Sequence, residues 1–149
     1  MNINIYDSFF QATRDVFHMM LDLSDIQEHP IDKFDFSNSL DISIGVIGDL
    51  EGEVFYRFPQ TTSINMVNIM VGMDLDSVDD FVTSAISEIA NIISGNVLTL
   101  LSGNDIRCDI LPPVLSKPYE NKNYTLRTSS CITTSAGEVC LDIRLNPAV

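Results

Sequence analysis

The most informative stretch of this chain is Phe81-Val-Thr-Ser-Ala-Ile-Ser-Glu-Ile-Ala-Asn-Ile-Ile-Ser-Gly-Asn-Val97. On a helical wheel that advances about 100° per residue, its side chains separate into two faces. One face collects the apolar residues Val82, Ile86, Ile89, Ala90, Ile93, Val97 and Leu100. The opposite face collects Ser84, Glu88, Asn91 and Gly95. The pattern predicts an amphipathic helix, from about Ser77 or Val78 to Ser102, that packs its apolar face on a sheet and ends at Gly103.

The sequence on either side of this helix predicts two more helices and several strands. Apolar spacing predicts a helix over Phe9 to Leu23, capped near Asp7 or Ser8, and a short helix over 62–70. Strands are predicted at 42–58 (two runs around the turn 48–52), 106–111, 125–133 and 137–145, with loops at 24–39 and 116–124. This order predicts an α+β fold with helices packed on a mostly antiparallel β-sheet.

Two short segments echo each other along the chain. Gly52-Glu-Val54 and Gly137-Glu-Val139 lie 137 − 52 = 85 positions apart. Each begins a predicted strand that follows an earlier helix, a strand and a turn. The echo favours an internal pseudo-repeat of a helix followed by strands. The length of 149 residues predicts a single domain, 1–149.

Composition limits the partners that the chain can bind. Eight basic residues against 21 acidic ones give a formal net charge of −13. A field of that sign repels phosphate backbones and anionic lipid, so neither nucleic acid nor a membrane surface is an expected partner. The N-terminus shows no basic segment or cleavage site typical of a signal peptide, and no run of about 18 to 20 consecutive apolar residues occurs. These features favour a cytoplasmic location.

The three cysteines do not form a recognisable metal-binding pattern. Cys108, Cys131 and Cys140 lack C-x-x-C spacing, and His18 and His29 are the chain's two histidines. No metal site is therefore expected. Cys131 and Cys140 are predicted to occupy small apolar positions on strands, as unpaired cysteines do in a reducing compartment.

Glu88 and Asn91 are the candidate functional pair, because residues three apart on a helix are surface neighbours. The amide of Asn91 has donors and an acceptor that can orient a water molecule, and the carboxylate of Glu88 can pair with a cation on a partner. Ser84, Ser87 and Gly95 are small enough to let that partner approach closely. Taken alone, such a pair is also typical of an ordinary solvated helix face.

Several motifs in the right order give the pair a context. The helix Ser87-Glu-Ile-Ala-Asn-Ile-Ile-Ser-Gly-Asn-Val97, preceded by Asp79-Asp80, resembles the signature helix of the CheC/CheX family of chemotaxis phosphatases. The hairpin Ser43-Ile-Gly-Val-Ile-Gly-Asp-Leu-Glu-Gly52 and the strand end Asp109-Ile-Leu-Pro-Pro113 also resemble that family. The resemblance spans most of the chain.

The resemblance implies a phosphatase that hydrolyses the aspartyl-phosphate of a CheY-like response-regulator receiver. Asn91 would then position the attacking water, and Glu88 would pair with the receiver's active-site lysine. The chain would need no cofactor of its own, because the receiver would supply the Mg²⁺. Only one Glu-x-x-Asn is present in the helices, which favours the single-motif CheX type and allows a homodimer.

Two positions depart from the family pattern, and two other functions stay open. Val97 replaces a smaller residue, and the loop after Pro113 lacks an expected glycine; both could change the fit to a partner. The main alternative is a non-catalytic receiver-binding adaptor or flagellar-switch-like module of the same fold. A ligand-binding domain unrelated to signalling would need a buried polar pocket, which no sequence motif indicates.

Overall fold

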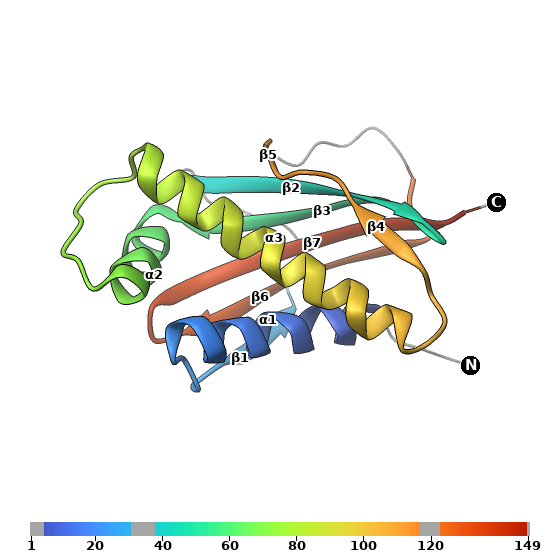
Figure 1. Cartoon of the computed structure of the whole chain (residues 1–149), viewed down its shortest axis with the longest axis horizontal. Helices are drawn as coiled ribbons and strands as arrows, with labels where there is room; N and C mark the ends of the chain where they lie inside the picture. Colours follow the sequence, from blue (N-terminus) through green and yellow to red (C-terminus); the bar gives the residue numbers. More distant parts are fainter. Residues whose placement is uncertain (1–4, 31–37, 117–122, 149) are drawn as a thin grey trace.

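A computed structural model describes residues 5–30, 38–116 and 123–148 of the chain. Within these ranges, three helices lie on one face of a seven-stranded antiparallel sheet (Figure 1). The helices are α1 (Ile5–Leu21), α2 (Gln60–Val71) and α3 (Asp80–Ser102). The strands are β1 (Gln27–Pro30), β2 (Ser39–Gly48), β3 (Leu50–Pro59), β4 (Cys108–Ile110), β5 (Val114–Leu115), β6 (Leu126–Thr134) and β7 (Gly137–Pro147). The predicted α+β architecture is confirmed.

The order of the strands has the symmetry that the sequence echo indicates. The sheet runs β1-β6-β7-β3-β2-β4, with β5 also pairing β2, so the two long hairpins β2–β3 and β6–β7 meet at its centre. Each hairpin is extended by a strand from the other half of the chain, because β1 pairs β6 while β4 and β5 pair β2. Helix α1 precedes the hairpin β2–β3, and helix α3 precedes the hairpin β6–β7. Because each hairpin is extended by a strand from the other half, the two halves of the chain are interlocked.

The hydrophobic core lies between the helices and the sheet. Along β3, Val54, Tyr56 and Phe58 point toward the helices and are fully buried, as the alternation of side chains on a strand requires. From α3 the core receives Val82, Ile86, Ile89, Ala90, Ile93, Val97 and Leu101. The predicted apolar stripe is thus correct except at its end, where Leu101 is buried and Leu100 only half-buried.

Several predicted boundaries are wrong. The long helix begins at Asp80 instead of Ser77 or Val78, because Asp79 is its N-cap, and the first helix begins at Ile5. The predicted loop over 24–39 contains β1, and β5 follows the proline pair where no strand was expected. Both missed strands are short and depend on pairing with distant partners. The segment 31–37 and most of the loop predicted for 116–124 lie outside the described residues.

The turn of the first hairpin is tighter than the glycine pattern suggested. Asp49 alone separates β2 from β3, and Gly52 lies inside β3 as the partner of Leu145. Gly52 has φ +151°, and a Cβ there would lie 2.0 Å from the carbonyl oxygen of Arg144. Glycine is required at this position because the neighbouring strand β7 passes so closely.

The sheet face turned away from the helices is polar and largely buried. Arg57 donates to Asp41 at 2.6 Å across the β2–β3 pair, and Arg144 donates to Asp142 at 2.7 Å along β7. Both pairs are buried. Because each of these two guanidinium groups lies against a carboxylate, neither buried charge of the two pairs lacks an opposite charge.

Cys131 and Cys140 form a disulfide on the same polar face, which corrects the expectation of two unpaired cysteines. They are direct cross-strand partners in the β6–β7 ladder, with Cα atoms 4.1 Å apart. Both lie on strands and are buried, as predicted. The pairing was missed because the register that sets the two residues opposite each other depends on the hairpin turn at Thr134–Gly137.

We expect the disulfide to stabilise the hairpin measurably. Closing a loop of this sequence separation, 9 residues, corresponds to about 2.5 kcal/mol in the chain-entropy model. Thermal unfolding with and without dithiothreitol should show a lower midpoint in the reductant. The double variant Cys131→Ala/Cys140→Ala should be insensitive to dithiothreitol, and Cys108→Ala, which removes the free cysteine, should behave as wild type. Equal midpoints for the wild-type protein in both buffers would contradict the bond.

Candidate functional site

Both ends of α3 are fixed by local interactions. The carboxylate of Asp79 accepts a hydrogen bond from the backbone N–H of Val82 at 3.0 Å, which satisfies one of the free donors of the first turn. The acidic side chain of Asp80 adds a favourable charge at the positive end of the helix dipole. At the other end, the N–H of Gly103 bonds the carbonyl of Thr99. The helix therefore starts and stops at defined residues.

The composition of α3 would also suit a membrane-spanning segment. Over Asp80–Ser102 it reaches a mean hydropathy of 1.3 in its most apolar window. Most of its large apolar residues, however, lie on a face that is packed on the sheet, and the outward face carries Glu88 and Asn91. This is the arrangement of a core helix in a globular domain.

A polar contact inside the core connects α3 to the central strand β3. The hydroxyls of Tyr56 and Ser94 share a hydrogen bond of 2.8 Å, and both residues are buried. Burial raises the pKa of the Tyr56 phenol well above its ordinary value, so the group stays neutral. Ser94 is the one polar residue among the buried residues of α3. Because a hydrogen bond is directional, this contact fixes the rotation of α3 about its own axis.

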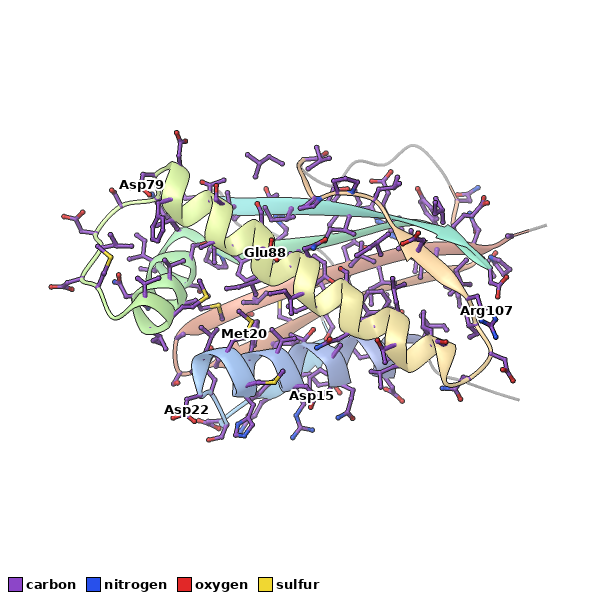
Figure 2. All side chains as sticks on the ribbon, viewed as in Figure 1. Asp15, Met20, Asp22, Asp79, Glu88 and Arg107 are labelled. Carbon is purple, nitrogen blue, oxygen red and sulfur yellow. A yellow bond between two sulfur atoms is a disulfide. The ribbon has the colours of Figure 1, made fainter. Side chains whose placement is uncertain are left out.

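The outward face of α3 carries the predicted site residues. Glu88 and Ser84 are exposed, while Ser87, Asn91 and Gly95 are half-buried. Figure 2 labels Glu88 midway along α3, on the helix that lies in front of the sheet. Glu88 and Asn91 are one turn apart, as predicted, but Asn91 is partly covered instead of fully exposed, because it is turned about 60° toward Ser94.

Gly95 occupies the same outward face without a structural reason inside the chain. A Cβ added there would meet no heavy atom within 4 Å. Glycine in the middle of a helix costs about 0.5–1 kcal/mol relative to alanine. Since the folded chain does not need glycine here, the gap is available to a partner surface that comes close to the helix.

The site is an open helix surface and does not line either described cavity. A cavity of about 300 Å³ lies beside the starts of β2 and α2 and is lined by Asn38, Ser39, Leu40, Gln60 and Val78. A second, of about 270 Å³, lies between α1 and the segment after it, against Arg14, Asp15 and His18. Neither includes Glu88 or Asn91. The pair can therefore act on a group that another molecule presents to it.

One group of residues in the described chain has the composition of a metal site. Cys131, Glu138 and Cys140 have ligand atoms within 4.8 Å of one another. The two sulfurs are bonded to each other, however, and a disulfide sulfur is not a thiolate ligand. The cluster does not qualify as a metal centre in this state.

The comparison with protein families decides where the chain belongs. The model of the family described as "Chemotaxis phosphatase CheX" matches residues 42–136, a range that includes most of β2 and all of β3, α2, α3, β4, β5 and β6. The chain belongs to the CheX family. Both the outward pair on α3 and the hairpin glycines fall inside the matched range, so the family resemblance seen in the sequence is confirmed.

Individual relatives agree with this assignment. The CheY-P phosphatase CheX of Thermotoga maritima is 30% identical over 86 residues, which are 57% of this chain and 56% of the relative. The match thus spans little more than half of that protein. A chemotaxis protein CheX from Vibrio vulnificus has the same fold, with a TM-score of 0.81 at 19% identity, covering 95% of this chain and 99% of the other.

A third relative was solved together with a partner. The CheX–CheY–BeF₃–Mg²⁺ complex from Borrelia burgdorferi matches with a TM-score of 0.76 at 21% identity, covering 97% of this chain and 99% of the other. At such identities the likeness establishes the fold.

The sequence did not indicate every residue on which this site depends. The helical pattern places Ser94 on neither face of the helix, and the sequence predicts for Tyr56 only a position on a strand. The available signal was a serine beside the apolar stripe, where an aliphatic residue would be expected. Its partner on β3 depends on how α3 is positioned over the sheet, which the sequence alone does not predict.

We expect the Tyr56–Ser94 contact to behave as a coupled pair in unfolding. Ser94→Ala leaves the Tyr56 hydroxyl buried without this partner, which should lower the free energy of unfolding by about 1–3 kcal/mol. The double variant Tyr56→Phe/Ser94→Ala removes both polar groups and should cost less than the sum of the single changes. Urea denaturation of the four proteins measures the coupling.

A buried hydroxyl elsewhere provides the control. Thr13 donates to the carbonyl of Phe9 at 2.7 Å within α1, so it contributes no link between helix and sheet. The control variant Thr13→Val should show no coupling with Tyr56→Phe. Strict additivity of the Tyr56 and Ser94 changes would mean that the two hydroxyls do not depend on each other.

Proposed function

We propose that this chain is a phosphatase that hydrolyses the aspartyl-phosphate of a CheY-type receiver domain, acting in the cytoplasm as a single domain, 1–149. The observation that supports the proposal is that Glu88 and Asn91 lie side by side on the open face of α3. The opposite face of α3 is held on the sheet by apolar packing and by the Tyr56–Ser94 hydrogen bond. A site of this shape needs the partner to bring the reacting group. The Thermotoga maritima relative, a CheY-P phosphatase, supports this choice of substrate.

In the proposed reaction, water attacks the phosphorus and the bond from phosphorus to the aspartyl oxygen breaks. The products are inorganic phosphate and a free aspartate on the receiver. The Asn91 amide holds the attacking water in line with the bond that breaks. Positioning of this kind accounts for much of the catalysis in phosphoryl transfer. The reaction requires no covalent intermediate on this chain.

Glu88 has a different task in this proposal. Its exposed carboxylate pairs with the receiver's active-site lysine, which sets the two proteins in one register. The Mg²⁺ that offsets charge on the phosphoryl oxygens belongs to the receiver, in keeping with the Mg²⁺ present in the Borrelia burgdorferi complex. The chain itself then contributes one carboxylate and one amide.

The alternative is a receiver-binding adaptor without activity. Such a protein would use Glu88 for docking but would gain nothing from a water-orienting amide one turn away. The half-buried position of Asn91 favours the enzyme, because its partly restricted side chain is better suited to hold a water than a freely rotating one.

The two side chains should affect different kinetic constants. Phosphate release from a phosphorylated receiver is measured as a function of receiver concentration. Asn91→Ala should lower kcat by about 100-fold with little change in KM, because it removes a group that acts in the transition state. Glu88→Ala should raise KM by about 10-fold or more, because it removes a docking contact.

Glu51→Ala serves as the control, since Glu51 is an exposed glutamate on β3. Its kinetic constants should equal those of the wild type. If the wild-type chain binds the phosphorylated receiver without accelerating phosphate release, the adaptor is the correct function.

We expect the substitution Gly95→Ala to stabilise the fold while weakening the docking of the receiver. Gly95→Ala adds a methyl group in open space and improves helix propensity, so the free energy of unfolding should rise by about 0.5–1 kcal/mol. The same methyl group should hold the receiver away from the helix and raise KM several-fold.

Gly103→Ala is the matched control, because the position lies just past the end of α3 with an ordinary αR backbone. An added Cβ there would have its nearest contact at 3.5 Å, from the carbonyl oxygen of Leu100. KM should be unchanged in this variant. An unchanged KM in Gly95→Ala as well would remove Gly95 from the docking surface.

A further inference from the structure

Phe81 is an aromatic residue on the outward face of α3 that the core does not use. Its side chain is 49% exposed, and it belongs neither to the buried core cluster nor to the half-buried residues that pack against that cluster. The other outward positions near it are small or polar, such as Ser84 and Glu88. An aromatic ring half in water is unfavourable for the free chain, whereas an interface with another protein can bury it.

Phe81 and Glu88 lie on the same ridge of the helix. Seven residues of α-helix turn through about two full turns less 20° and rise about 10.5 Å, so the two side chains point in nearly the same direction. Ser84 lies between them, and Gly95 continues the same line two turns beyond Glu88. We call these four residues, Phe81, Ser84, Glu88 and Gly95, the outward ridge.

The size of a stable complex requires contacts beyond the reacting pair. A specific protein–protein interface buries about 800 Å² on each partner, and its affinity is concentrated in a few buried side chains, often aromatic. Glu88 and Asn91 supply two polar side chains, which set orientation more than affinity. A receiver that reaches both must also cover neighbouring surface, and Phe81 is the one large, exposed apolar residue on the described face of α3.

The charges around the ridge indicate the chemistry of the surface that covers it. No Lys, Arg or His occurs between Arg57 and Arg107, a stretch that contains α2 and α3. Asp79 and Asp80 stand beside Phe81 at the start of the helix, where both are exposed. A complementary partner presents basic side chains around an apolar patch. A second copy of this chain, with a net charge of −13, is a poor match for the same surface.

We propose that Phe81 is the apolar anchor of the receiver interface, inserting into an apolar patch that lies beside the lysine paired with Glu88. This inference rests on the proposed function, because it assigns the same receiver to the ridge. The receiver then contacts α3 at two places. Glu88 pairs with its lysine, and Phe81, about two turns away, is buried in its apolar patch. The reacting Asn91 lies beside the Glu88 contact, one turn further along α3.

The test separates binding from turnover. Affinity is measured by titrating a CheY-type receiver, activated with beryllofluoride and Mg²⁺, against each variant, and kcat and KM are measured with the phosphorylated receiver. Phe81→Ala should raise Kd and KM about 10- to 100-fold and leave kcat within about twofold. Phe81→Leu, which keeps an apolar side chain, should show a smaller rise.

The control is Leu115→Ala, because Leu115 is 58% exposed but lies on β5 at the edge of the sheet. It should bind as wild type does. An unchanged Kd for Phe81→Ala, or a fall in kcat at constant Kd, would overturn the assignment. So would size-exclusion chromatography showing that Phe81→Ala dissociates a dimer while receiver affinity stays constant.

The two proposals fail in different ways. A wild-type chain that binds the receiver through Phe81 but releases no phosphate would keep the anchor and refute the phosphatase. A wild-type chain that hydrolyses normally and is indifferent to Phe81→Ala would keep the phosphatase and refute the anchor. A wild-type chain that does not bind the receiver at all refutes both.

Discussion

The hydrogen bond between Tyr56 and Ser94 is the constraint on which the geometry of the outward face depends. The apolar stripe of α3 holds the helix against the sheet, but apolar contacts are non-directional and allow small rotations and shifts. A hydroxyl pair buried in that interface favours one rotation, because any other would leave two polar groups unsatisfied. Since Asn91 lies one turn before Ser94 on the same helix, the direction in which Asn91 leaves the helix depends on this contact with β3.

That arrangement is well suited to a site that is completed by another protein. The chain supplies a rigid helix with small residues, a carboxylate and an amide, and the two cavities described above lie elsewhere. In the proposed reaction the receiver brings the phosphoryl group, the metal ion and the lysine. Rigidity then serves catalysis directly, because the two halves of the site come together only during the encounter and have little time to adjust.

The sequence predicted the local features of this structure and missed those that depend on pairing. The faces of α3 and the positions of Glu88, Asn91 and Gly95 follow from helical periodicity, which needs no knowledge of the rest of the fold. β1 and β5 were missed because short strands are defined by their distant partners. The Cys131–Cys140 bond and the Tyr56–Ser94 contact were missed for the same reason, since each requires the register of one element on another.

The interlocked sheet also has a consequence for how the chain is made. One of the two strands at its centre, β7, pairs with both β3 and β6, and it follows every other strand of the sheet in chain order. Until residues 137–147 have left the ribosome, the two halves of the sheet cannot join, and the edge of β3 that β7 later covers has no strand beside it. The helix α3 is complete when α1 and the β2–β3 hairpin are already made, but before β6 and β7 complete the sheet. The growing chain therefore carries the apolar face of α3 on an incomplete sheet until the last strands are made.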